Sequence, residues 1–198
     1  MFQHIRADFL RAAEAHRALF DKLPKLVFDS GLHAVLLYRL SHWLCVHHLF
    51  WLGVVVSYWN SVFTGAQISP HAVIGKGLLV HHPRGLVIGP VAIGAYCTFT
   101  RLNMVGQRRG GGDWPSIGDH FYAGRGAKVL GRIQIGNNVR VEPQAVVIDS
   151  LPDGVRATGI PAKIVSEDLR DEQLSKSRFA SRREDQNVLT ALRDADRF

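Results

Sequence analysis

Residues 117–147 read IGDHFY-AGRGAK-VLGRIQ-IGNNVR-VEPQAV-V, so an aliphatic residue or an alanine returns at every sixth position. A second apolar residue follows each of the first five by four positions, from Phe121 to Ala145. Such a period is typical of units made of one short strand and one turn, with the recurring side chain pointing inward. Three units close one triangular coil of about 18 residues. This stretch therefore predicts a parallel β-solenoid.

The same period extends toward the N-terminus, with two interruptions. The interruptions are HHPRG at residues 81–85 and QRRGGGDWPS at residues 107–116. A coil cannot absorb such insertions in its core, so we expect both to project from it, and projecting segments commonly line the binding face of a repeat protein. The earlier inward positions are Ile68, Ile74, Val80, Ile88, Ile93, Phe99 and Val105.

The segments outside the repeat predict helices. Apolar residues at helical spacing indicate helices over residues 3–20 and 31–48. Residues 49–63, LFWLGVVVSYWNSVF, are apolar but shorter than the roughly 20 residues of a membrane-spanning helix. We expect a buried helix there, with contact to a membrane or to another subunit as the alternative. The expected organisation is a helical region over 1–64, a solenoid over 65–165 and a charged C-terminal helix or tail over 166–198.

Charge and cysteine content limit the expected cellular compartment and the expected classes of partner. The formal net charge is +7, but the basic residues are dispersed around turns without a stacking aromatic platform, so nucleic acid is not an expected partner. Cys45 and Cys97 are far apart and neither belongs to a CxxC motif, which favours a reducing compartment. The N-terminal residues show no secretory signal. We expect a cytoplasmic protein, or one peripheral to the inner face of the membrane.

Two stretches carry a family resemblance. AQISPHAVIGKGLLVHHPRGLVIG at residues 66–89 and the segment from PSIGDHFY to GIPAKIV at residues 115–165 resemble the serine O-acetyltransferase family. Within it, they are similar to the shorter colanic acid and other polysaccharide O-acetyltransferases. AVLLYRLSHWL at residues 34–44 resembles the helix that precedes the coils in this family. The resemblance implies a mainly β, left-handed parallel β-helix, with acetyl-CoA as the donor and a hydroxyl group as the acceptor.

The resemblance also implies a catalytic residue. The family's catalytic histidine matches His82, within His81-His82-Pro83-Arg84-Gly85. An imidazole can accept the proton of the attacking hydroxyl group and return one to the departing thiolate. His82 is thus the expected general base.

The neighbours of that histidine depart from the family pattern. The aspartate that orients the base aligns with Gln67, about one coil below. The acidic residue that faces the substrate ammonium aligns with His81, and the Arg-His pair that meets the substrate carboxylate aligns with Asp113 and Trp114. A zwitterion gains little from a pocket without charged partners. We therefore expect a sugar or a polysaccharide precursor as the acceptor, with Trp114 as either a stacking face or a loop anchor.

Further positions follow from the resemblance. Arg84 is expected to help bind the acceptor. The phosphates of the donor would meet the basic side chains of Arg140 and Lys163. A role as solvated basic residues on turns is an equally good interpretation of both. The expected donor-binding residues are Gly106, Gly124, Gly126, Arg140 and Lys163.

Several alternatives stay open. The first is a serine O-acetyltransferase of cysteine biosynthesis, and two remote ones are a non-catalytic scaffold and a zinc-dependent β-helix enzyme that uses His81, His82 and His120. No metal is expected, because the predicted solenoid lacks the histidine spacing of the zinc enzymes. We expect a homotrimer with three sites between subunits, rather than a hexamer. The use of longer acyl-CoA donors is left open.

Overall fold

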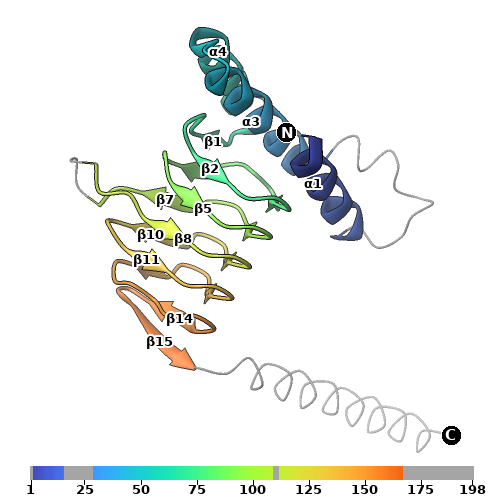
Figure 1. Cartoon of the computed structure of the whole chain (residues 1–198). Helices are drawn as coiled ribbons and strands as arrows, with labels where there is room; N and C mark the ends of the chain where they lie inside the picture. The colour runs from blue at the N-terminus through green and yellow to red at the C-terminus, as the bar shows by residue number, and fades with distance from the viewer. Residues whose placement is uncertain (1, 16–28, 109–111, 167–198) are drawn as a thin grey trace, which may run out of the picture. The chain divides into compact units, whose positions relative to one another are not determined.

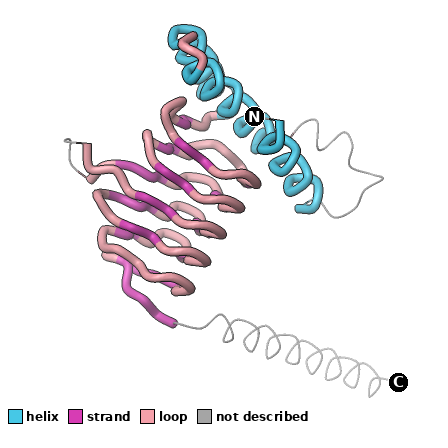
Figure 2. The backbone as a smooth tube through the Cα atoms, viewed as in Figure 1, coloured by secondary structure: helices cyan, strands magenta, loops and turns pink. Residues whose placement is uncertain are grey.

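The computed structural model describes residues 2–15, 29–108 and 112–166. The described residues up to Val165 form one compact unit in which helices lie at one end of a β-solenoid (Figures 1 and 2). The helices within the described ranges are α1 (Phe2–Ala15), α3 (Ser30–Val46) and α4 (Phe50–Thr64). The predicted helix over residues 3–20 thus matches α1 as far as Ala15, and the predicted C-terminal helix or tail lies outside the described residues.

Three parallel sheets form the faces of the solenoid. Sheet A has the order β1-β4-β7-β10-β13, sheet B the order β11-β8-β5-β2, and sheet C the order β15-β14-β12-β9-β6-β3. Each strand pairs with the strand one coil away, as in the register Gln67 to Val87. The strands are β1 (Gln67–Ile68), β2 (Val73–Ile74), β3 (Leu79–Val80), β4 (Val87–Ile88), β5 (Ala92–Ile93), β6 (Thr98–Phe99), β7 (Met104–Gly106), β8 (Ser116–Ile117), β9 (Tyr122–Ala123), β10 (Lys128–Leu130), β11 (Gln134–Ile135), β12 (Arg140–Val141), β13 (Val146–Val147), β14 (Arg156–Gly159) and β15 (Ala162–Ser166).

The hexad leaders fill the interior of the solenoid. Because successive side chains of a strand point to opposite faces, the second residue of each two-residue strand turns inward and the first turns outward. Burial of each aliphatic side chain contributes roughly 1.5–3 kcal/mol. This confirms the inward positions that the period predicts. The leaders from residue 117 to residue 147 are all buried, namely Ile117, Ala123, Val129, Ile135, Val141 and Val147.

The glycines after the leaders are explained by a column of side chains at one corner. Asn137 Oδ1 accepts a hydrogen bond from the Asp119 N–H at 2.8 Å, and Asp153 Oδ1 accepts one from the Asn137 N–H at 2.7 Å. A Cβ on Gly118 would lie 2.6 Å from Asn137 Oδ1, and one on Gly136 would clash with Asp153 Oδ1. The Gly-Asp and Gly-Asn pairs therefore let each coil cap the backbone of the coil below it.

A buried ion pair attaches the helices to the first coil. Arg39 of α3 contacts Asp8 of α1 at 3.0 Å and donates hydrogen bonds to the carbonyl groups of Ile74 and Gly75. Asp8 in turn accepts the N–H of Leu78 at 2.8 Å. The helical region and the solenoid thus share one hydrogen-bonded network.

The expectation that residues 49–63 form a buried helix is wrong about burial. In α4 only Gly53, Asn60 and Thr64 are buried. The amide of Asn60 donates to the carbonyl of Ala34 at 3.0 Å, so the polar side of α4 packs inward on α3. The apolar side therefore faces outward. Among the described residues, no helix is long and apolar enough to cross a membrane.

Candidate active site

His82 lies at a corner of the solenoid. It follows β3 of sheet C, and the chain enters β4 of sheet A five residues later. Its φ is 56°, in the left-handed region that few non-glycine residues adopt, and its side chain is exposed. The same conformation recurs at other corners, for example at Tyr96 and His120, so it belongs to the turns of the solenoid. The first interruption of the repeat thus projects as predicted.

Gln67 lies on the same side of the solenoid, one coil below. The Gly85 N–H donates to the Gly65 carbonyl at 2.9 Å, which stacks the segment that carries His82 on the turn that precedes Gln67. The predicted placement one coil apart is therefore correct. No hydrogen bond joins the Gln67 and His82 side chains among the described residues, so the single chain holds them near one corner without a formed pair.

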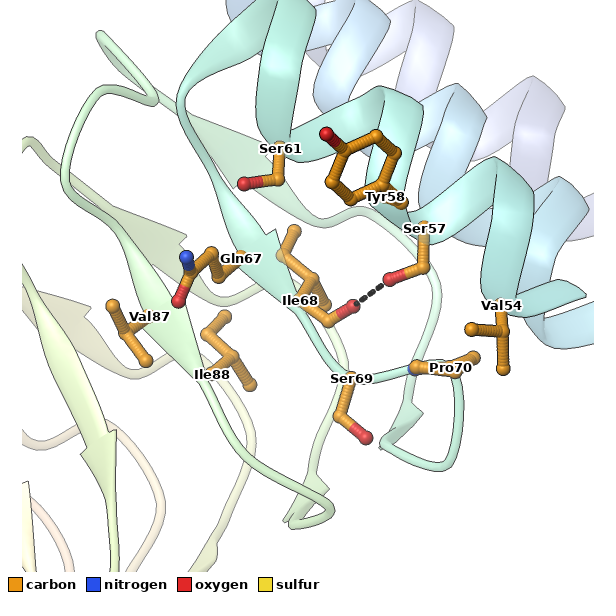
Figure 3. A pocket seen from close by; sticks show the side chains of 10 residues that line it. All are labelled: Val54, Ser57, Tyr58, Ser61, Gln67, Ile68, Ser69, Pro70, Val87 and Ile88. Carbon is orange, nitrogen blue, oxygen red and sulfur yellow. Dashed lines mark hydrogen bonds between the residues drawn. The ribbon is translucent and has the colours of Figure 1, made fainter.

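Gln67 lines a pocket of about 430 Å³ between α4 and the first strands of sheet A. Figure 3 shows Gln67 on β1 and, across from it, side chains from α4. Ser57 donates to the Ile68 carbonyl at 3.2 Å, which holds α4 against β1. Of the described residues that line the pocket, none is charged. They are Val54, Ser57, Tyr58, Ser61, Gln67, Ile68, Ser69, Pro70, Val87 and Ile88.

The sequence did not point to the hydroxyl groups of this pocket. Ser57, Tyr58 and Ser61 come from the apolar segment that we expected to be buried. The signal that was present is their spacing. Ser57 and Ser61 are four residues apart, which places both on one side of a helix.

The second interruption of the repeat places Trp114 against the solenoid. A Cβ on Gly89 would clash with the Trp114 ring, and the ring packs partly buried on the core. Of the two interpretations of Trp114, the structure supports the loop anchor. Asp113 is exposed and lines a pocket of about 290 Å³ with Arg108, Arg132 and others, apart from the pocket at Gln67. The structure does not bring Asp113 and Trp114 together with Gln67 in one pocket.

Two other predicted acceptor residues flank His82. His81 is exposed, and its N–H donates to the Phe99 carbonyl at 2.8 Å. Arg84 is also exposed, and its side chain lies over Gly65, where a Cβ would be 3.2 Å from Arg84 Cγ. Both therefore share the corner of His82.

The predicted donor glycines have a structural role in the stacking of the coils. The N–H of Gly124 donates to the Val141 carbonyl at 2.8 Å, and that of Gly126 to the Arg101 carbonyl at 3.0 Å. A Cβ on Gly124 would lie 2.6 Å from the backbone nitrogen of Pro143. The carbonyl of Gly106 accepts the Gly131 N–H at 3.0 Å. These backbone groups are occupied within the solenoid, and donor binding by them stays a prediction.

The two predicted phosphate ligands differ in their surroundings. The Arg140 guanidinium lies 4.6 Å from the ring centroid of Tyr122, and its Nε lies 3.3 Å from Glu142 Oε1. Arg140 is thus engaged on its own sheet. Lys163 on β15 is exposed. Phosphate binding by either residue stays a prediction.

The zinc alternative lacks its three-histidine cluster. His120 stacks on Tyr96 with 5.3 Å between ring centroids, at the corner between sheets B and C, whereas His81 and His82 follow β3. Within residues 2–15, 29–108 and 112–166, no group of three or more His, Cys, Asp or Glu residues is arranged to hold a metal ion.

Known proteins similar to this chain share one name. The serine acetyltransferase of Synechococcus elongatus is 34% identical over 168 residues, covering 83% of this chain and 69% of that protein. The serine acetyltransferase of Helicobacter pylori (strain J99) is 36% identical over 162 residues, covering 80% and 94%. No family model matches the chain.

Solved structures give the same result for the fold. The serine acetyltransferase of Neisseria gonorrhoeae in complex with serine superposes with a TM-score of 0.76 at 30% identity, covering 83% of this chain and 68% of that one. The serine acetyltransferase of Brucella abortus in complex with coenzyme A gives a TM-score of 0.76 at 27% identity, covering 83% and 67%.

The solenoid with helices at its N-terminal end and the similarity to these enzymes define the class of left-handed β-helix acyltransferases, which confirms the predicted β-helix, its helical N-terminal region and the enzyme class. Within that class, the chain belongs to the serine acetyltransferase family. The polysaccharide O-acetyltransferase part of the resemblance finds no support among these relatives.

Proposed function

We propose that this protein transfers an acetyl group from acetyl-CoA to the hydroxyl group of serine. The observation that carries the proposal is the 36% identity to a serine acetyltransferase over 94% of that protein's length. A relative bound to serine and one bound to coenzyme A support the acceptor and the donor. The relatives thus support the serine alternative better than the sugar acceptor that the sequence favoured.

The chemistry is assigned to His82. Its imidazole takes the proton of the acceptor hydroxyl group as that oxygen attacks the thioester carbonyl carbon. The tetrahedral intermediate then collapses, the carbon–sulfur bond breaks, and the imidazolium returns the proton to the thiolate of coenzyme A. The products are an O-acetyl ester and free thiol. The exposed position of His82 on a projecting turn supports this role, because both substrates can reach the ring.

Gln67 is a positioning residue in this proposal. Its amide can hydrogen-bond an imidazole and select one tautomer, but it carries no charge with which to stabilise the imidazolium. The family resemblance suggests a pair here, and the place of Gln67 on β1, one coil below His82, supports the assignment.

A neutral, hydroxyl-rich acceptor is the second candidate. The specific observation in its favour is that none of the residues that line the pocket at Gln67 is charged. Such a lining offers hydrogen bonds to hydroxyl groups but no partner for an ammonium or a carboxylate. With Trp114 packed on the solenoid, stacking on a sugar ring no longer supports this candidate.

A homotrimer is part of the proposal. Outward-facing residues such as Val73 and Met104 leave apolar area on the flat faces of the single solenoid, which neighbouring copies can cover. Mass photometry tests this directly, and a protein that is only monomeric would contradict it.

The deciding experiment measures thiol release from acetyl-CoA with a panel of acceptors. Serine turnover well above that of glucose, galactose and nucleotide sugars supports the proposal. Turnover with a sugar and none with serine would favour the second candidate. No thiol release with any acceptor would contradict both candidates.

A further inference from the structure

The outer side of α4 is an apolar stripe exposed to solvent. Trp51 is 80% exposed, Phe63 72% and Tyr58 65%, and Trp59 is 48% exposed. With Val55 and Val62 these residues recur at helical spacing, so they lie on one side of the helix. We call this set of six residues the α4 stripe.

The opposite side of α4 holds the helix in place through small and polar groups. A Cβ on Gly53 would lie 2.9 Å from the Ser41 carbonyl oxygen, so α3 and α4 approach closely there. Asn60 and Ser57 bond to the backbone of α3 and β1, and Thr64 donates to Asn60 at 2.8 Å. The orientation of α4 is thus fixed by contacts that leave the stripe outside.

The stripe is as large as the largest apolar patch of a typical monomer, and such patches often mark interaction sites. An aromatic side chain presents roughly 150–250 Å², so the four aromatic residues at the exposures given above present on the order of 500 Å². The exposed apolar patch of a typical monomer reaches about 300–600 Å², and the valines of the stripe, with Phe50 and Leu52 beside it, add to the aromatic area. Its size therefore indicates an interaction surface.

The charge around the stripe identifies the partner. No Asp or Glu occurs between Asp29 and Asp113, whereas six Lys or Arg residues do. Of these, Arg84 is exposed and lies at the Gly65 end of α4, and Lys76 is exposed on the first coil. The helices and the first two coils are thus free of acidic side chains outside α1. An anionic surface is attracted to such a region, and two copies meeting through it would repel one another.

From these observations we propose that the α4 stripe docks this enzyme on the surface of an anionic phospholipid bilayer. Trp and Tyr side chains favour the bilayer interface, where the ring is apolar and its polar end meets the headgroups. A helix of 15 residues is too short to span the membrane, so α4 lies in the plane of the interface. Arg84, at the Gly65 end of α4, meets lipid phosphates beside it.

Docking in this way places the candidate acceptor pocket at the lipid surface. Tyr58 belongs both to the stripe and to the lining of the pocket at Gln67 (Figure 3). The inference does not depend on the identity of the acceptor, because it rests on α4 and on the charge around it.

The test is co-sedimentation of the full chain with vesicles of phosphatidylcholine that contain phosphatidylglycerol. We expect the protein to pellet with these vesicles and its tryptophan emission to shift to shorter wavelength. The double variant Trp51→Ser, Phe63→Ser should bind at least ten times more weakly, with unchanged thiol release and unchanged assembly mass. The matched control is Ile164→Ser, Val165→Ser, which removes two exposed apolar residues from β15 and should bind as the parent does.

Two results would overturn the proposal. One is a parent protein that stays in the supernatant with these vesicles. The other is a Trp51→Ser, Phe63→Ser variant that falls to a smaller assembly mass, because the stripe would then be an interface between copies of the chain. Far-ultraviolet circular dichroism of each variant checks that α4 is still folded.

Discussion

Asp8 and Arg39 form a buried ion pair, 3.0 Å between Oδ2 and Nε, that ties α1 and α3 to the first coil of the solenoid. Removing one partner of such a pair leaves an uncompensated buried charge, which typically costs about 3–5 kcal/mol. We therefore expect Asp8→Ala to lower the free energy of unfolding by that amount, measured by urea denaturation.

The matched control is Glu142→Ala. Glu142 pairs with Arg140 at 3.3 Å and with Arg156 at 3.4 Å, but these side chains are 27–33% exposed. A pair in contact with solvent contributes about 0–1 kcal/mol. Equal losses in Asp8→Ala and Glu142→Ala would contradict the larger contribution of the buried pair to stability.

The role of His82 is tested by His82→Ala. Loss of a general base typically lowers the rate by about 10²–10⁴-fold, and we expect a fall in kcat within that range by thiol release from acetyl-CoA. The control is His120→Ala, because His120 is also an exposed corner histidine, with φ 57° against 56° for His82. Comparable losses in both variants would argue against a specific role for His82.

The substitution Gln67→Asp should raise kcat. A carboxylate in this position stabilises the imidazolium that forms during proton transfer, which an amide cannot do. Gln134→Asp is the control, because Gln134 is also the exposed first residue of a Gln-Ile strand, on sheet B. An unchanged kcat in Gln67→Asp would mean that Gln67 does not act through His82.

Coil stacking at Gly124 is tested by Gly124→Ala. A Cβ there would lie 2.6 Å from Pro143 N, so backbone must move, and we expect a loss of about 2 kcal/mol or more in the free energy of unfolding. Gly154→Ala is the control, because a Cβ there meets nothing within 4 Å. Its φ of 74° alone should cost about 1 kcal/mol of stability in an alanine variant. A Gly124→Ala protein as stable as the parent would refute the packing role.

The stability of the fold should fall above pH 9 because of Cys97. Burial raises the pKa of this thiol from 9.0 to about 11. The unfolded thiol then ionises at lower pH than the folded one, so its contribution is present below pH 9 and is lost as the pH rises toward 11. Urea midpoints at pH 8 and pH 10 should differ less in Cys97→Ala than in the parent. The same pH dependence in both proteins would contradict this.

The period of six determined the solenoid without help from tertiary structure. The pattern within each hexad predicts which residue points inward, because a strand alternates its side chains between two faces. Each two-residue strand also pairs with its equivalent one coil away. The same spacing placed Gln67, which the family resemblance singled out, one coil below His82, and it made the first interruption project. Repeats of this kind carry their long-range contacts in the sequence itself, since every neighbour is a copy of the same unit.

Only the tertiary structure decided which side of α4 faces the protein. The apolar composition of that segment favoured burial, but close approach at Gly53 and the hydrogen bond from Asn60 to Ala34 turn its polar side inward. The packing of Trp114 on Gly89 and the pairing of Asp8 with Arg39 depend in the same way on contacts between segments that are not repeats. No local period encodes such contacts, because their energy comes from one particular meeting of two surfaces.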